Sequence, residues 1–172
     1  MIELATLLAE LRATGFRDLA GARLSASVPV SAALLNRLIA GALAGSGAPV
    51  RSVDVQPRAG DQIDVVIKVT WPFVPALTAR LTIEQQPAFP ASPRLTLRWS
   101  FLGAVGALGS RFVSSLARLP DGISLDADRL VVDIPAAAAQ SPAAEFLPYV
   151  SALELHTVDD RLLIHLELDL HR

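Results

Sequence analysis

The stretch VRSVDVQPRAGDQIDVVIKV, residues 50–69, decides the fold class because its side chains alternate between apolar and polar. The odd-numbered positions are mainly valine and isoleucine, and the even-numbered positions are mainly polar. A period of two is typical of antiparallel strands that have one dry face and one wet face. The segment RAG, which lies between Pro57 and Asp61, predicts a three-residue hairpin turn with Gly60 in the left-handed conformation.

The same parity continues through two more expected strands. The apolar positions are all odd-numbered: Val53, Val55, Ile63, Val65, Ile67, Val69, Trp71, Leu77, Leu81, Ile83, Leu95, Leu97, Trp99 and Phe101. We expect residues 72–76 to join the second strand to the third, and the proline-rich segment 86–93 to join the third to the fourth. The pattern therefore predicts four antiparallel strands with a dry odd-numbered face.

Two helices and a strand are expected before these four strands. The first helix spans Ile2–Ala13 and has an apolar stripe formed by Leu4, Leu7, Leu8 and Leu11. Residues 21–30 alternate as a strand. Ser31 is suited to cap the next helix, residues 32–45. Its apolar stripe includes Leu34, Leu35, Leu38 and Ile39, while Asn36 and Arg37 are expected to face away.

Two further hairpins are expected in the second half of the chain. In the first, a two-residue turn places Asp126 opposite Arg129. In the second, a turn at Asp159-Asp160 places Glu154 opposite His165. The segment between them, residues 135–150, contains three prolines and predicts only a loop and a broken helix.

The segment FLGAVGALGSRFVSSLARL, residues 101–119, predicts a third helix although it contains three glycines. Phe101, Val105, Leu108 and Phe112 gather on one face of the helical wheel, and Gly106 and Gly109 lie at its edge. Three interpretations stay open. The glycines permit close packing of another backbone, they leave space for the chain of an apolar ligand, or the segment docks on a membrane surface.

This order of elements predicts one α+β domain that spans residues 1–172. We expect a long, curved antiparallel sheet wrapped around one or two amphipathic helices, as in a half-barrel.

Composition narrows the classes of function. The net charge of −2 and the lack of basic runs argue against nucleic-acid binding. Hydrophobic residues make up 52% of the chain and the mean hydropathy is +0.44, so the excess must line a large core, a cavity or an interface. The N-terminus carries Glu3 and Glu10 and does not resemble a signal peptide. We therefore expect a cytoplasmic protein, or an exported one if the chain was trimmed.

No motif indicates an enzyme, a cofactor or a metal. The chain has no cysteine, no GxSxG, no phosphate-binding GxxxxGK[ST] and no dinucleotide-binding GxGxxG. An esterase-like enzyme would need Ser110 or Ser114 to be activated by a distant histidine. The last strand carries the possible zinc ligands His165, Glu167, Asp169 and His171. They extend along about 20 Å of strand, so we interpret them as a solvated face.

Two segments resemble bacterial tubular lipid-binding (TULIP-like) domains. These are GARLSASVPVSAALLNRLIAGALAG, residues 21–45, and ISLDADRLVVDI, residues 123–134. The first is similar to the strand that leads into an apolar helix in those domains, and the second is similar to their later hairpin. The resemblance implies a sheet rolled around a helix, with an apolar groove that holds lipid tails.

We therefore expect a non-enzymatic protein that binds or transfers a lipid or another long apolar ligand, with possible transient contact to a membrane. The expected apolar lining is Leu34, Leu35, Leu38, Ile39, Val65, Ile67, Val69, Trp71, Leu97, Trp99, Phe101, Val105, Leu108 and Phe112. Arg111 and Arg118 could meet a head group. The alternative is a structural or protein-interaction module with a solid core, whose surplus apolar surface forms a homodimer.

Overall fold

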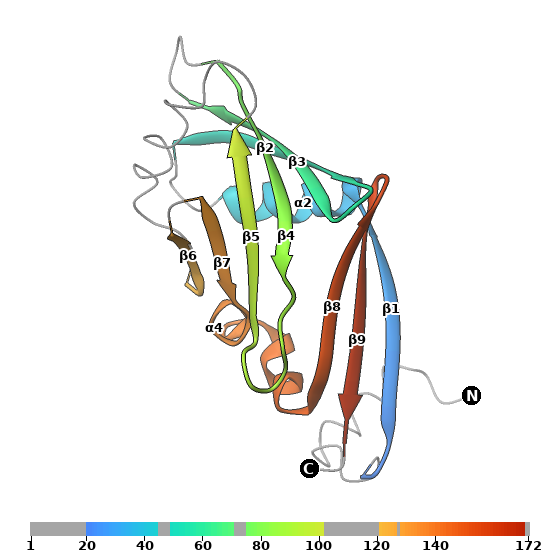
Figure 1. Ribbon diagram of the computed structural model, residues 1–172. Coiled ribbons are helices and arrows are strands. Elements are labelled where there is room, and N and C mark those ends of the chain that lie inside the picture. Colours follow the sequence, from blue (N-terminus) through green and yellow to red (C-terminus); the bar gives the residue numbers. More distant parts are fainter. Residues whose placement is uncertain (1–19, 45–48, 71–74, 102–120, 127, 171–172) are drawn as a thin grey trace, which may run out of the picture.

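The structure is a computed structural model that describes residues 20–44, 49–70, 75–101, 121–126 and 128–170 (Figure 1). Its elements in chain order are β1 (Arg23–Ser31), α2 (Ala32–Leu43), β2 (Val50–Arg58), β3 (Gln62–Val69), β4 (Leu77–Gln85), β5 (Arg94–Phe101), β6 (Ile123–Asp126), β7 (Arg129–Asp133), α4 (Ile134–Ala138), the 3-10 helix η2 (Pro142–Tyr149), β8 (Val150–Val158) and β9 (Arg161–Asp169). The prediction of an α+β fold with antiparallel strands is confirmed. The helix expected over residues 2–13 lies outside the described residues, and so does the helix expected over residues 101–119 except for Phe101, which is the last residue of strand β5.

The strands form two antiparallel sheets, where one long sheet was expected. One sheet has three strands in the order β1-β9-β8, and the other has six in the order β2-β3-β4-β5-β7-β6. The first strand of the described chain thus pairs with the last. The six-stranded sheet contains only strands from the middle of the chain. No backbone ladder joins β8 or β1 to a strand of the larger sheet, so the two sheets are counted as separate.

The predicted parity of the six-stranded sheet is confirmed. Odd-numbered residues pair with odd-numbered residues across its first four strands, as in Val55 with Val65 and Leu81 with Trp99. The exceptions follow two register shifts, where Val50 pairs with Val69 and Gln85 pairs with Thr96. The first turn is displaced by one residue from the prediction, because Arg58 pairs with Gln62. Gly60 has the predicted positive φ of 80°, and the next residue, Asp61, also has a positive φ of 58°. Aspartate tolerates this conformation better than most side chains do.

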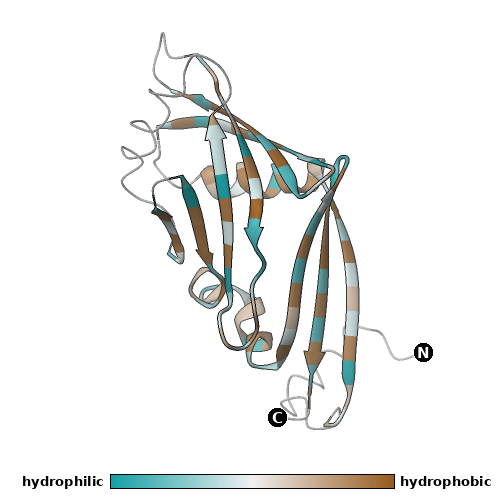
Figure 2. Ribbon diagram, viewed as in Figure 1, coloured by the Kyte–Doolittle hydropathy of each residue, from teal (hydrophilic) through white to brown (hydrophobic). Residues whose placement is uncertain are grey.

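Both later hairpins have the predicted registers. Asp126 pairs with Arg129 in the β6–β7 hairpin. Glu154 pairs with His165 in the β8–β9 hairpin. The broken helix between them is confirmed as α4 followed by η2. Figure 2 shows the resulting alternation of hydrophobic and hydrophilic residues along the strands.

The tips of two hairpins hold the sheets together. The Asp160 N–H donates to the carbonyl oxygen of Pro57 at 3.1 Å, and the Ala59 N–H donates to Asp159 Oδ1 at 3.2 Å. These bonds link the β8–β9 turn to the β2–β3 turn. In Figure 1 the two turns lie beside each other above the strands of the smaller sheet.

Two more contacts reinforce this junction. Thr157, which is only 4% exposed, donates its hydroxyl to the carbonyl oxygen of Arg58 at 2.5 Å. The Thr157 N–H donates to the carboxylate of Asp61 at 3.0 Å. The buried hydroxyl therefore has the partner that burial demands.

Sheet edges are protected from pairing with other chains. The Ala22 carbonyl accepts the Leu170 N–H and the Ala32 N–H donates to the Asp160 carbonyl, so even-numbered positions bond toward β9. The odd-numbered positions, including Pro29, therefore direct their backbone toward the other edge of β1, which no described strand pairs with. Proline has no N–H to offer another strand. At the opposite edge of the larger sheet, β6 has only four residues.

The buried apolar core is small within the described residues. Its members are Val30, Val65, Val69, Leu77, Ala79, Leu95, Leu97, Val150, Leu162 and Leu170. Most of them lie on the odd-numbered face of the six-stranded sheet. Among the described helices, none combines the length and apolar content needed to cross a membrane.

Candidate functional site

The odd-numbered face of the six-stranded sheet contains six of the predicted lining residues that the structure describes. Val65, Val69 and Leu97 are each 7% exposed and form part of the protein core. Ile67, Trp99 and Phe101 are only half-buried. The rings of Trp99 and Phe101 lie 4.8 Å apart and are tilted by 54°. The face therefore changes from a closed core to a partly open aromatic surface at the end of β5.

Helix α2 carries the other four described lining residues and buries none of its side chains. Its N-terminus is formed as predicted, since the Ser31 hydroxyl accepts the Leu34 N–H at 3.3 Å. Leu34 is 37% exposed and Leu38 is 62% exposed, while Leu35 and Ile39 are half-buried. An apolar stripe on a helix normally packs against a core. Here Leu38 is mostly exposed, and the other three residues of the stripe are only partly covered.

Asn36 attaches α2 to the edge of the six-stranded sheet, which corrects the expectation that it faces away. Its Nδ2 donates to the carbonyl oxygen of Val55 at 3.1 Å, and its Oδ1 accepts the Val55 N–H at 2.7 Å. The amide thus takes the place of a neighbouring strand along β2. The only signal in the sequence is the amide beside Arg37 inside the run LLNRLI, which is otherwise apolar.

A cavity of about 400 Å³ lies between α2 and the first half of β2. Its lining is Asn36, Ala40, Leu43, Ala44, Val50, Arg51, Ser52, Val53 and Asp54. Most of these residues were missed by the sequence analysis because the cavity forms only where helix and strand meet. Asp54 pairs with Lys68 at 3.9 Å, whereas no described carboxylate pairs with Arg51. The cavity therefore has a mixed polar and apolar lining and includes Arg51, a cation that no described carboxylate pairs with.

The even-numbered face of the six-stranded sheet is covered by ion pairs. Asp64 lies between two guanidinium groups, with Nε atoms of Arg80 at 2.8 Å and of Arg58 at 3.0 Å. The hydrogen bond from Arg80 lowers the pKa of Asp64. Glu84 lies between Arg98 and Arg129 in the same manner. The hydrogen bond between Arg129 and Glu84 raises the pKa of Arg129.

These charges pair across strands but do not cancel, because two carboxylates lie among four guanidinium groups. Each carboxylate is already paired with two cations, and the groups are accessible to water. Exposed pairs of this kind contribute little stability each. We interpret this network of ion pairs as the solvated face of the sheet.

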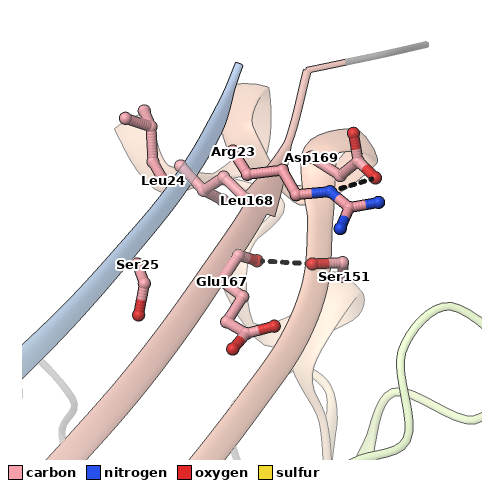
Figure 3. Close-up of a pocket in the computed structure, with 7 residues that line it drawn as sticks. All are labelled: Arg23, Leu24, Ser25, Ser151, Glu167, Leu168 and Asp169. Atoms are coloured by element: carbon pink, nitrogen blue, oxygen red, sulfur yellow. Dashed lines mark hydrogen bonds and ion pairs between the residues drawn. The ribbon is translucent and has the colours of Figure 1, made fainter. Parts of the chain in front are cut away.

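A second cavity, of about 380 Å³, lies at the end of the three-stranded sheet (Figure 3). Its lining is Arg23, Leu24, Ser25, Ser151, Glu167, Leu168 and Asp169. Arg23 pairs with Asp169 at 3.7 Å and has an 81% exposed side chain. The Ser151 hydroxyl donates to the carbonyl oxygen of Glu167 at 3.3 Å. The polar groups are thus paired with each other in a shallow, exposed site.

The last strand does not assemble a metal site in the part of the chain that the structure describes. Nε2 of His165 lies 3.5 Å from Glu167, and Nδ1 of the same ring lies 3.0 Å from the Ser27 hydroxyl. No group of three or more described histidine or carboxylate side chains could hold a metal ion. His171 lies outside the described residues.

Several predicted site residues also lie outside the described residues. They are Trp71, Val105, Leu108, Arg111, Phe112 and Arg118, together with the serines Ser110 and Ser114. Their roles stay predictions.

Comparison with known proteins identifies no relative. No family model, no curated protein and no solved structure matches the chain. The resemblance to tubular lipid-binding domains therefore also stays a prediction, and any function must be argued from the residues themselves.

Proposed function

We propose that the protein is a non-enzymatic binder of a lipid or another long apolar molecule, held between the six-stranded sheet and its helices. The observation that supports this proposal is the incomplete burial of the apolar stripe of α2, above all of Leu38. Leu38 is 62% exposed on a helix that buries no residue, although the helix is attached to the sheet edge. Exposed apolar surface of this kind marks a binding site for an apolar partner.

The half-buried aromatic residues provide the second apolar surface. Trp99 and Phe101 lie at the end of β5 directly before residues 102–119, for which a helix with the stripe Val105, Leu108 and Phe112 is predicted. In this proposal the sheet curves around both helices, and the small residues Gly106 and Gly109 leave space for the ligand chain. Each methylene removed from water contributes about 0.8 kcal/mol. A long apolar chain in the ligand is therefore sufficient for affinity, and no reactive group in the protein is needed.

The cavity between α2 and β2 is suited to the polar end of such a ligand. Its volume of about 400 Å³ falls within the range of about 300–1,000 Å³ that is usual for small-molecule sites. Arg51 is exposed there, and a guanidinium can bind a carboxylate or phosphate with two hydrogen bonds. Arg111 and Arg118 are further candidates for the same role.

Native mass spectrometry of the gently purified chain tests the proposal. We expect a bound apolar molecule at unit stoichiometry, which organic extraction then identifies. For a quantitative test, a fatty acid that carries a dansyl group is titrated into the delipidated protein. Leu38→Asp should weaken binding by roughly tenfold or more, because it removes the most exposed leucine of the stripe.

The matched control is Arg37→Ala, which changes an exposed neighbour on the same helix. It should leave the affinity for the dansyl fatty acid unchanged. Absence of both a co-purifying ligand and saturable probe binding would overturn the proposal.

A second candidate is an interaction module that forms a homodimer. Leu24 and Val28 on β1 are 46% and 49% exposed, so apolar surface is also available away from the six-stranded sheet. A ligand-free dimer in native mass spectrometry would favour this candidate over the carrier.

A further inference from the structure

One face of the three-stranded sheet is apolar along its whole length, and this second surface is independent of the proposed ligand site. It is formed by even-numbered residues of β1 and β9 and by odd-numbered residues of β8. Its central members are Leu24, Ala26, Val28, Leu153, Leu155, Ile164, Leu166 and Leu168. We call it the apolar face of the small sheet.

Burial is uneven over this face. At the junction with the larger sheet, Val30 and Leu162 are each 9% exposed. Away from the junction, Leu24 and Val28 remain almost half exposed. Among the described helices only α2 has more than slight contact with this sheet, and it does so next to Ser31. The β1 members of the apolar face of the small sheet are therefore exposed, whereas its β8 and β9 members are half-buried. Val150, which pairs with Leu168 at the far end, is 6% exposed.

We propose that residues Ile2–Ala13 form a helix that packs on the apolar face of the small sheet. The apolar stripe predicted for this segment, Leu4, Leu7, Leu8 and Leu11, is the surface that such packing requires. A sheet with one apolar face is stable when a second layer covers that face.

The dimensions of the two elements match. Three strands spaced about 4.8 Å apart span about 10 Å, and one helix with its side chains is about 10–12 Å wide. A single helix therefore covers the width of this sheet. Its 12 residues would extend about 18 Å along strands that are about 30 Å long.

Connectivity favours this segment over the other undescribed ones. Nine residues, 14–22, separate the predicted helix from β1 and span at most about 30 Å, so the helix can fold back over the small sheet. Residues 102–120 instead connect two strands of the larger sheet. Elements that follow each other in the chain are usually adjacent in space.

A second copy of the chain is the main competitor for this face. The tether keeps residues 2–13 at an effective concentration in the millimolar range, which exceeds that of a second copy in dilute solution. Pro29 also disfavours pairing through the free edge of β1. Residues 2–13 of the same chain are therefore favoured over a second copy as the occupant of this face.

Cysteine cross-linking tests the proposal without background because the chain has no cysteine. Leu7→Cys is combined with Ala26→Cys on β1 and, separately, with Leu166→Cys on the central strand β9. A short bifunctional thiol reagent should then link the pair within one molecule of the full chain. Two sheet positions are used so that the angle of the helix does not decide the result.

Two matched controls place one cysteine on the wrong side. Thr6→Cys with Ala26→Cys uses the opposite side of the predicted helix, and Leu7→Cys with Ser25→Cys uses the opposite face of β1. Adding Leu4→Asp and Leu11→Asp to the productive pair should reduce the intramolecular yield by roughly tenfold or more, because the buried stripe is lost.

Each result decides the question. A monomeric cross-link in either productive pair, stronger than in both controls, supports docking of residues 2–13. Cross-linked dimers assign the face to a second copy and overturn the proposal. Absence of a preferred cross-link at both sheet positions also overturns it, whatever the outcome of the ligand-binding experiments.

Discussion

The six-stranded and three-stranded sheets are built from strands with the same alternating pattern, and they differ in what covers their apolar faces. In the larger sheet, Val65, Leu77 and Leu97 are 7%, 2% and 7% exposed. In the smaller sheet, Leu24 and Val28 on the edge strand β1 are 46% and 49% exposed, although Val30 and Leu162 near the junction are each 9% exposed. Alternation therefore specifies which side of a strand is apolar, while the neighbouring elements decide whether that side becomes core or an open surface.

The two sheets nevertheless use the same device to close an edge. An amide side chain binds both backbone groups of one residue in each case. Asn36 binds Val55 on β2 of the larger sheet. Gln86 binds Leu155 on β8 of the smaller sheet, with distances of 2.6 and 3.0 Å. Because Gln86 follows directly after β4, this pair also ties the small sheet to the large one.

The largest effect is expected where the large sheet meets α4. Gly122 has φ of +80°, and a Cβ there would lie 2.3 Å from the Ala137 nitrogen and 2.8 Å from the Asp133 oxygen. Gly122→Ala should lower the free energy of unfolding by about 2–4 kcal/mol, measured by urea denaturation. Gly41→Ala is the control, because a Cβ at that helical position meets nothing within 4 Å. It should stabilise the protein by about 0.5–1 kcal/mol.

If Gly122→Ala proves as harmless as Gly41→Ala, the contact of Gly122, the residue before β6, with α4 does not stabilise the larger sheet. The contrast between a well-anchored large sheet and an open small sheet would then fail.

The two amides allow the sheets to be compared directly. Asn36→Ala and Gln86→Ala each leave two backbone groups without their partner, at an expected cost of about 1–3 kcal/mol. Amide hydrogen exchange should accelerate at Val55 in the first variant and at Leu155 in the second, with little effect on the other sheet.

The neighbouring residues serve as controls. Arg37→Ala and Gln85→Ala change exposed side chains beside each amide and should alter stability by less than about 0.5 kcal/mol. Exchange that accelerates in both sheets at once would contradict the view that they open separately.

Thr157 tests the junction between the sheets. Thr157→Val keeps the side-chain volume but removes the hydroxyl that donates to the Arg58 carbonyl, so we expect a loss of about 1–2 kcal/mol in thermal or urea unfolding. Thr70→Val, at an exposed position, should be nearly neutral. Equal effects for the two substitutions would show that the junction does not depend on this bond.

The smallest effect concerns the wet face of the large sheet. Arg80 lowers the pKa of Asp64 in the folded protein, so the folded state binds that proton more weakly than the unfolded state does. The contribution of this carboxylate is therefore complete above the unfolded pKa of about 3.9 and is lost as the pH falls through the lower folded value. Asp64→Asn should make the melting temperature depend less steeply on pH, and it should do so only below about pH 4. A parallel curve for the variant would contradict the prediction.

Much of the backbone was predictable because it depends on neighbours in the sequence. The parity of β2–β5, the registers of the β6–β7 and β8–β9 hairpins and the cap at Ser31 follow from alternation and turn chemistry. These features require only that a strand has two sides and that a short turn has few allowed conformations. The fold class followed from the same patterns.

Only the tertiary structure decided how these elements are distributed and joined. The pairing of β1 with β9 divides the strands into two sheets, and it brings together residues at least 130 positions apart, such as Ser31 and Arg161 (161 − 31 = 130). The roles of Asn36 and Gln86 arise from the strand edges that they meet, and no local pattern encodes those edges. An alternating sequence determines its own apolar side, whereas the element that packs on that side depends on contacts between distant parts of the chain.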